Sequence, residues 1–173
     1  EFIDLQRMGL EYGVRIIPEI DIPAHSLAFA HYKPEIASRK YGMDHLDLYK
    51  KETYQFVDSL LDEYLSGDNP VFIGDLHIGT DEYNKKEAEQ YRYFTDRYLK
   101  FVEKYGKNVR MWGGLKWLPG KTPVKAEGVT VNAWSYDWVD PVVSLQDGYK
   151  LINTCDTYLY LSLIHISEPT RPY

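Results

Sequence analysis

The 173-residue sequence has a single cysteine, Cys155, and no apolar run near the length of a membrane-spanning helix. One cysteine excludes an internal disulfide framework, and a spanning helix needs about 20 consecutive apolar residues. Positive charge is also scarce, because 20 Lys and Arg stand against 26 Asp and Glu and give a net charge of -6. Nucleic-acid binding requires a basic surface that meets phosphates, so no nucleic-acid partner is expected. The length suits one globular domain.

Short β-rich runs alternate with helical patterns along the chain. The sequence predicts strands over residues 14–20, 70–78, 108–114, 129–134 and 149–154, and helices over residues 50–66, 85–106 and 140–147. Such alternation favours a parallel sheet covered by helices. No glycine-rich phosphate loop follows any of these strands, which disfavours a nucleotide-binding sheet. The expected fold class is therefore α/β, a partial (β/α)8 TIM barrel carrying about strands 3–7.

Polar and aromatic side chains follow the predicted strands. In such barrels the functional groups lie where strands end and the loops to the helices begin. That rule selects eight residues: Asp21, His25, His77, Asp81, Glu82, Trp112, Trp134 and Tyr158. Carboxylates for acid–base chemistry, a histidine to orient one of them and aromatic rings as walls together fit a sugar pocket.

Asp81 and Glu82 are neighbours within the segment HIGTDEY, residues 77–83. Like charges this close raise the cost of ionising each other. A solvated helix start is one interpretation of the pair, because acidic side chains favour the first turn of a helix. A catalytic acid and base is the other, and these two residues alone leave both interpretations open.

Two motifs together resemble those of glycoside hydrolase family 20, the β-N-acetylhexosaminidases. They are IPEIDIPAHS at residues 17–26 and HIGTDEY at residues 77–83. Members of that family show PE-[IL]-D-x-P-G-H and then H-[IL]-G-G-D-E at successive strand ends. The resemblance covers residues 1–160. It implies a glycosidase that removes terminal β-linked N-acetylhexosamine, or a disaccharide ending in it, from a glycan substrate, with no cofactor and no metal.

The resemblance also implies substrate-assisted retaining catalysis, in which the sugar's own 2-acetamido oxygen attacks the anomeric carbon and gives an oxazolinium intermediate. Glu82 matches the general acid/base, and Asp81 matches the residue that orients the acetamido nitrogen. The residues agree with this division, because neighbours at a strand end point in different directions. Asp81 and Glu82 are then poorly placed as nucleophile and acid on one bond, but well placed if the nucleophile belongs to the substrate.

Supporting roles also follow from the resemblance. Trp112 and Trp134 match aromatic walls of the acetamido pocket, and Tyr158 matches a tyrosine that hydrogen-bonds the acetamido carbonyl. Asp21 matches a polar residue of the substrate site. Two histidines match residues that support the site from behind it, namely His25 and His77.

Three positions depart from the family pattern. Thr80 stands where the family more often has glycine, Gly113 follows a tryptophan where an acidic residue is common, and Tyr160 replaces a sugar-binding aspartate. The segment HIGTDEY, together with MWGG at residues 111–114, resembles the lacto-N-biosidase branch of the family. The departures leave N-acetylglucosamine, N-acetylgalactosamine and a galactosyl-N-acetylglucosamine unit open as substrates.

The two ends of the sequence carry their own expectations. Residues 161–171, LSLIHISEPTR, correspond to the in-frame translation of a DNA-sequencing adaptor, so we expect residues 161–173 to be a non-native tail and residues 1–160 to be a partial catalytic domain. An open barrel exposes strand edges and lacks part of its pocket, so poor activity is expected of this segment alone. No segment identifies a compartment; the expected parent is a bacterial enzyme that is secreted or held at the cell surface.

Two other functions stay open. A metal-dependent hydrolase is one, with Asp21, His25, His77 and Asp81 as ligands, although their spacing matches no standard zinc motif such as H-E-x-x-H. An inactive glycan-binding remnant is the other, although pure binding requires no general acid.

Overall fold

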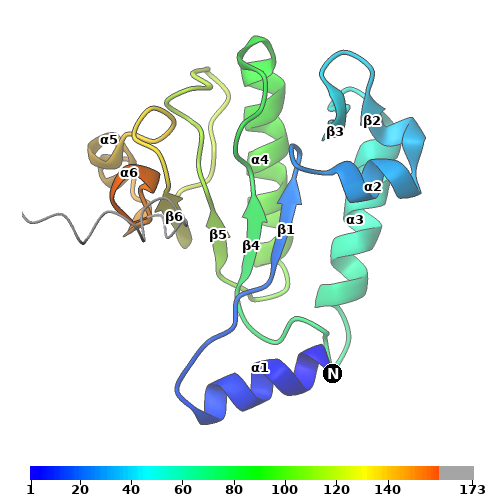
Figure 1. The fold of residues 1–173 in the computed structure, drawn as a ribbon, viewed down its shortest axis with the longest axis vertical. Helices are drawn as coiled ribbons and strands as arrows, with labels where there is room; N and C mark the ends of the chain where they lie inside the picture. The colour runs from blue at the N-terminus through cyan, green and yellow to red at the C-terminus, as the bar shows by residue number, and fades with distance from the viewer. Residues whose placement is uncertain (160–173) are drawn as a thin grey trace, which may run out of the picture.

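The computed structural model describes residues 1–159, with Tyr158 described by its backbone only, and the predicted tail lies outside this part of the chain. Five strands form one sheet, in the order β1-β4-β5-β6-β7 (Figure 1). They are β1 (Glu19–Ile22), β4 (Leu76–Gly79), β5 (Val109–Met111), β6 (Val129–Ala133) and β7 (Lys150–Asn153). Every neighbouring pair is parallel. The predicted α/β class with a parallel sheet is confirmed.

Helices connect the strands, as the alternating pattern predicts, except between β5 and β6, where residues 112–128 form no helix. The three connecting helices of the prediction are α3 (Lys51–Leu65), α4 (Ala88–Glu103) and α5 (Pro141–Gln146). The start of α5 is fixed by its sequence, because Asp140 accepts hydrogen bonds from the first free amides of the helix and Pro141 occupies the first turn. Within residues 1–159, no helix is both long enough and apolar enough to cross a bilayer.

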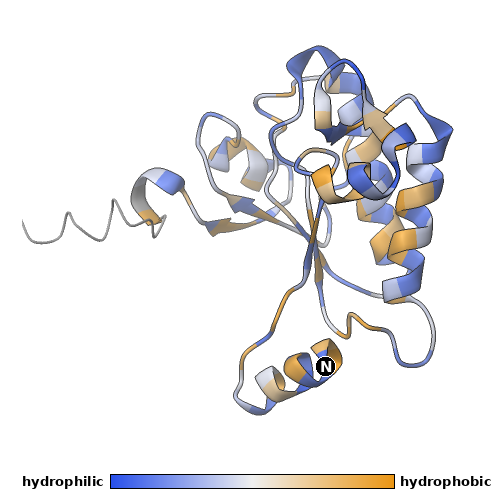
Figure 2. Ribbon diagram, turned by 45° about the vertical axis from the view of Figure 1, so that its right-hand side comes forward, coloured by the Kyte–Doolittle hydropathy of each residue, from blue (hydrophilic) through white to orange (hydrophobic). Residues whose placement is uncertain are grey.

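The core lies between the sheet and the helices that cover it. α4 buries Tyr91, Phe94, Tyr98 and Val102, which recur at helical spacing on one side of the helix. α3 does the same, and Figure 2 shows hydrophobic residues on the strands and on one side of that helix. Each fully buried side chain of this size contributes about 1.5–3 kcal/mol to folding. This packing fixes where the carboxyl ends of the strands lie.

The first strand differs from the prediction. It spans Glu19–Ile22 rather than residues 14–20, and its ladder begins where Glu19 pairs with His77. The His77 amide donates to the carbonyl of Pro18, at 2.9 Å. Pro18 has no N–H of its own, so it cannot donate to a ladder. The shift moves Asp21 from a loop into the strand, one residue before its end.

A further unit stands between β1 and α3 that the sequence did not predict. It holds α2 (Leu27–Tyr32), a 3-10 turn (Pro34–Ile36) and a hairpin of β2 (Ala37–Ser38) and β3 (Gly42–Leu46), at the carboxyl end of β1 (Figure 1). The hairpin holds the chain on both sides of His25. The Leu46 amide donates to the carbonyl of Pro23 and the Ser26 amide donates to the carbonyl of Asp44, both at 2.8 Å.

Two short helices lie outside this connecting pattern. α1 (Phe2–Glu11) is tied to the loop before β4 by Gln6, whose Nε2 donates to the carbonyl of Val71 at 2.7 Å. α6 (Asp156–Leu159) follows β7 directly and carries the backbone of Tyr158.

Candidate active site

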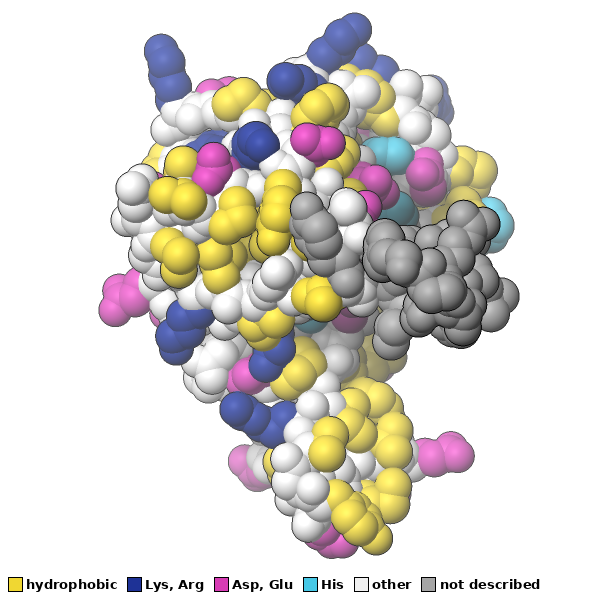
Figure 3. Space-filling view, turned by 60° about the vertical axis from the view of Figure 1, so that its left-hand side comes forward, with side chains coloured by type: hydrophobic (Ala, Val, Ile, Leu, Met, Phe, Trp, Pro, Cys, Tyr) yellow, Lys and Arg dark blue, Asp and Glu magenta, His cyan; other side chains and the backbone are white. Residues whose placement is uncertain are grey.

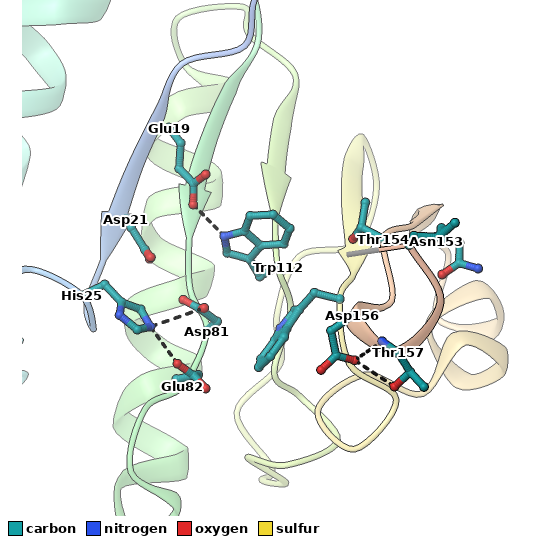
Figure 4. A pocket seen from close by; sticks show the side chains of 12 residues that line it. Glu19, Asp21, His25, Asp81, Glu82, Trp112, Asn153, Thr154, Asp156 and Thr157 are labelled. Atoms are coloured by element: carbon teal, nitrogen blue, oxygen red, sulfur yellow. Dashed lines mark hydrogen bonds and ion pairs between the residues drawn. The ribbon is translucent and has the colours of Figure 1, made fainter. Parts of the chain in front are cut away.

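A cavity of about 820 Å³ opens at the carboxyl ends of the strands (Figure 4). Its lining comes from β1, from the loops after β4, β5 and β6, and from the end of β7. The lining residues are Glu19, Asp21, His25, Asp81, Glu82, Trp112, Trp134, Asn153, Thr154, Asp156, Thr157 and Leu159. Six of the eight residues selected from the sequence are among them. The other two are His77, which lies buried behind the cavity, and Tyr158, whose side chain falls outside the described part of the chain.

The carboxylates of Asp81 and Glu82 both contact the imidazole of His25. Nε2 of His25 lies 2.9 Å from Oε2 of Glu82 and 3.5 Å from Oδ2 of Asp81 (Figure 4). Asp81 is mostly buried, with 13% of its side chain exposed, whereas 44% of the Glu82 side chain reaches solvent. Figure 3 shows acidic and histidine side chains gathered on one part of the surface. One carboxylate is therefore held at the floor of the cavity and the other at its mouth.

The backbone at this point is strained. His25, Thr80 and Glu82 have φ angles of 53°, 65° and 45°, in the left-handed region that side chains other than glycine seldom adopt. Such conformations cost about 1–3 kcal/mol each and persist only where the surroundings enforce them. Here the buried Tyr91 donates its hydroxyl to the carbonyl of Thr80 at 2.5 Å and holds the first part of the loop. Loop strain of this kind is common at active sites.

Asp21 lies against Asp81 across the β1–β4 pair. Burial, and then the negative charges of Asp81 and Glu19, raise the pKa of Asp21 to about 8. Burial also raises the pKa of Asp81, and the nearby His25 opposes that rise. Oδ1 of each carboxyl is buried without a protein donor. A proton held on Asp21 and donated to Asp81 satisfies both groups, so the pair carries one negative charge rather than two.

Gly79 makes this approach possible. An added Cβ on Gly79 would lie 1.8 Å from Oδ1 of Asp21, and the residue has a φ of +68°. Any side chain here would push Asp21 away from its partner. The glycine of HIGTDEY thus serves the contact between two strands as well as the turn.

The wall of the cavity is held by Glu19 and His77. Oε1 of Glu19 accepts a hydrogen bond from Nε1 of Trp112 at 2.6 Å. The His77 ring packs against the Trp112 ring with centroids 4.7 Å apart, and its Nδ1 accepts from the Gly79 amide at 3.1 Å. Burial, and then the charge of Arg110, lower the pKa of His77 to about 4, so the ring is neutral near pH 7. Together these groups fix the plane of the indole.

Glu19 was missed by the sequence reasoning, and a signal for it was available. Side chains at positions i and i+2 of a strand share a face, so the selection of Asp21 also points to Glu19. The placement of the strand over residues 14–20 concealed this relation, because it put Asp21 in a loop.

The far wall comes from β6 and β7. Trp134 follows β6 and packs on Trp138 with ring centroids 5.8 Å apart. Asp156 is a further carboxylate on this side, and its Oδ1 accepts from the amide and hydroxyl of Thr157 at 2.8 and 3.2 Å. The sequence reasoning also missed Asp156, although it follows a predicted strand.

A cation has one place to bind among the described residues. Asp21, His25 and Asp81 offer ligand atoms that all lie within 4.8 Å of one another. The imidazole of this group also lies 2.9 Å from the carboxylate of Glu82. His77, the fourth ligand considered from the sequence, is not part of this group.

Comparisons with known proteins agree with this geometry. The sequence profile described as "Glycosyl hydrolase family 20, catalytic domain" matches residues 1–92. A beta-hexosaminidase of Arthroderma benhamiae is 29% identical over 181 residues, which cover 86% of this chain and 29% of that protein. The lacto-N-biosidase of Bifidobacterium bifidum is 27% identical over 169 residues, which cover 82% of this chain and 15% of that protein.

A solved structure gives the same result for the fold. The GH20 beta-N-acetylhexosaminidase of Streptomyces coelicolor A3(2) superposes with a TM-score of 0.68 at 27% identity and covers 87% of this chain and 32% of its own. The predicted partial TIM barrel is thereby confirmed. The chain spans about a third or less of the length of these relatives.

Proposed function

Because this chain belongs to glycosyl hydrolase family 20, we propose that the whole protein removes terminal β-linked N-acetylhexosamine, or a disaccharide ending in it, from glycans. The proposal rests on one observation: the carboxylates of Asp81 and Glu82 both contact Nε2 of His25, in the cavity that Trp112 also lines. We assign residues 1–160 to the catalytic barrel and regard residues 161–173 as non-native.

Glu82 is the general acid and base. It lies at the mouth of the cavity, where a leaving oxygen enters, and it is bonded to His25 at 2.9 Å. A positioned carboxylic acid that protonates the leaving group accelerates such a reaction by about 10²- to 10⁴-fold. After the glycan leaves, the same carboxylate takes a proton from the attacking water.

The nucleophile belongs to the substrate. A retaining enzyme with its own nucleophile places two carboxyls about 5–5.5 Å apart on opposite sides of the scissile bond. Asp81 and Glu82 contact the same nitrogen of His25, so they share one side. Asp21 is unsuited as a nucleophile, because its raised pKa keeps it protonated near neutral pH.

Asp81 instead holds the acetamido group. Its ionised carboxylate accepts a hydrogen bond from the acetamido N–H, and this turns the acetamido oxygen toward the anomeric carbon. Asp21 donates to Asp81 and holds it in this position. We assign Trp112 and Trp134 as walls of the acetamido pocket and Tyr158 as the donor to the acetamido carbonyl, and His77 supports Trp112 from behind.

The test is turnover of three substrates by the full-length protein. They are aryl glycosides of N-acetylglucosamine, of N-acetylgalactosamine and of galactosyl-N-acetylglucosamine, the last because of the lacto-N-biosidase relative. Glu82→Gln should lower turnover of a natural disaccharide by about 10²-fold or more, and Asp81→Asn should be similarly severe. Glu103→Gln, on the outer face of α4, is the matched control and should keep full activity. Full activity of Asp81→Asn would refute the assignment.

A metal-dependent hydrolase is the second candidate, and the Asp21–His25–Asp81 group favours it. A chelator separates the two functions. The glycosidase proposal predicts unchanged activity after treatment with chelator and gel filtration. Loss of activity that an added divalent cation restores would support the metal enzyme instead.

A further inference from the structure

Glu87 is a buried carboxylate that lies outside the cavity. It ends the 3-10 turn Lys85–Glu87 before α4, and only 8% of its side chain is exposed. Its Oε1 accepts hydrogen bonds from Nζ of Lys40 at 2.7 Å and from the hydroxyl of Tyr41 at 2.5 Å, and its Oε2 accepts from the hydroxyl of Tyr49 at 2.5 Å. These donors lower the pKa of Glu87 to about 2, so it is ionised at any working pH.

The donors all belong to the segment around the hairpin of β2 and β3. Lys40 and Tyr41 form its turn, and Tyr49 follows its second strand. The same hairpin holds the backbone on both sides of His25, through its hydrogen bonds to Pro23 and Ser26. Glu87 is therefore connected, through the hairpin, to His25, the histidine bonded to the proposed acid Glu82.

Glu87 also lies on the loop that carries Glu82. That loop is attached to the hairpin a second time by Tyr83, whose buried hydroxyl donates to the carbonyl of Leu46 at 2.7 Å. Glu82 and His25 both have positive φ angles. Strained residues keep one conformation only where surrounding contacts enforce it, and the hairpin contacts are such a constraint on both partners.

We propose that Glu87 is a positioning residue for the general acid: it fastens the hairpin to the Glu82 loop and thereby sets the contact of His25 with Glu82. The inference rests on the proposed function of Glu82. Asp81 does not depend on this constraint to the same degree, because Asp21 holds it from the sheet. Loss of Glu87 should then impair proton donation to the leaving group more than attack by the acetamido oxygen.

The first turn of α4 offers a comparison for a purely structural role. Glu89 accepts hydrogen bonds from the amides of Lys121 and Thr122 at 2.6 and 2.9 Å and from the Thr122 hydroxyl at 2.6 Å. It has as many bonds as Glu87 but is attached to the connection between β5 and β6 rather than to the hairpin. Glu89→Ala therefore matches Glu87→Ala in hydrogen bonds lost.

The experiment compares kcat/KM of the full-length protein on two substrates. One is a disaccharide of β-linked N-acetylglucosamine, whose leaving alkoxide requires protonation, and the other is a dinitrophenyl glycoside, whose phenolate leaves without it. For Glu87→Ala we expect a loss on the disaccharide about tenfold larger than on the dinitrophenyl glycoside. Glu89→Ala should lower both by the same factor. Glu87→Gln, which keeps an acceptor, should recover part of the loss. An equal loss on both substrates with Glu87→Ala would overturn the inference.

A wild-type protein that turns over neither substrate, nor the N-acetylgalactosamine and galactosyl-N-acetylglucosamine glycosides, would refute the proposed function instead. The inference then rests on amide hydrogen exchange, which reads the constraint without catalysis. The amides of Ser26 and Leu46 should exchange about tenfold faster in Glu87→Ala than in Glu89→Ala. Equal exchange rates in the two variants would show that Glu87 does not hold the hairpin.

Discussion

Replacing Asp21 with asparagine is expected to change how stability depends on pH. In the unfolded chain this carboxyl loses its proton near its ordinary pKa of 3.8, whereas burial and the charges of Asp81 and Glu19 raise the pKa to about 8 in the folded protein. Between these values the folded state binds more protons than the unfolded state. Raising the pH therefore lowers the free energy of unfolding across this window. Asp21→Asn removes the titration, and its amide N–H can still donate to Asp81.

The size of the effect follows from the proton count. A difference of one proton changes the free energy of unfolding by about 1.4 kcal/mol per pH unit. From about pH 5 to pH 7 the wild type should lose up to about 2.7 kcal/mol relative to Asp21→Asn. His77 acts in the opposite direction between about pH 4 and 6.5, because its pKa is lowered in the folded state. Both proteins share that contribution, so the difference between them reports on the Asp21–Asp81 pair.

The assay is urea unfolding of the two proteins at about pH 5, 6 and 7. Asp68→Asn, an exposed loop substitution, is the control and should follow the wild type. The free energy of unfolding should fall more steeply with pH in the wild type than in Asp21→Asn. Parallel curves would refute the shared proton between Asp21 and Asp81.

Three other measurements test the surroundings of the cavity. Gly79→Ala should lower the free energy of unfolding by about 3 kcal/mol or more, because the new Cβ would overlap Asp21. Gly67→Ala, also at positive φ but in open space, should lower it by about 1 kcal/mol. Equal losses in urea unfolding would contradict the close approach of Gly79 to Asp21. The imidazole NMR signals of His77 should not titrate between about pH 5.5 and 8, since its pKa is about 4, and a midpoint in that range would show an ionisable ring. Glu19→Ala should raise KM about tenfold by freeing the Trp112 indole, while Glu19→Gln keeps an acceptor and should change it little; equal KM values would show that the bond is unimportant.

Much of the fold was predictable because its signals are local. The helices α3, α4 and α5 carry their own apolar spacing, and strands that alternate with such helices form a parallel sheet. The rule that functional groups follow strand ends brought six of the selected residues to one cavity. Each of those inferences uses only nearby residues in the sequence.

The remaining features depend on contacts between distant segments. The register of β1 is set by pairing with His77, so the apolar run before Pro18 misled the prediction. The hairpin is held by Glu87 and by backbone bonds to the His25 loop, and its residues lack the alternation that marks a strand.

The pKa shifts in the site also depend on contacts between distant segments, so the sequence alone did not predict them. Adjacency suggested that Asp81 and Glu82 perturb each other, but burial is the largest cause of the raised pKa of Asp81, and the charge of Glu82 contributes least. The charge of Asp81 also raises the pKa of Asp21, which lies 60 positions away in the sequence and on the neighbouring strand of the sheet.

The central claim is that the substrate supplies the nucleophile, and fluorination of the acetamido group tests it most directly. Each fluorine withdraws electrons from the acetamido oxygen and weakens it as a nucleophile, with little change in size. We predict that kcat/KM of the full-length protein falls steeply from the acetamido to the mono-, di- and trifluoroacetamido glycosides. A rate that stays the same across the series would contradict the account and require a nucleophile from the protein.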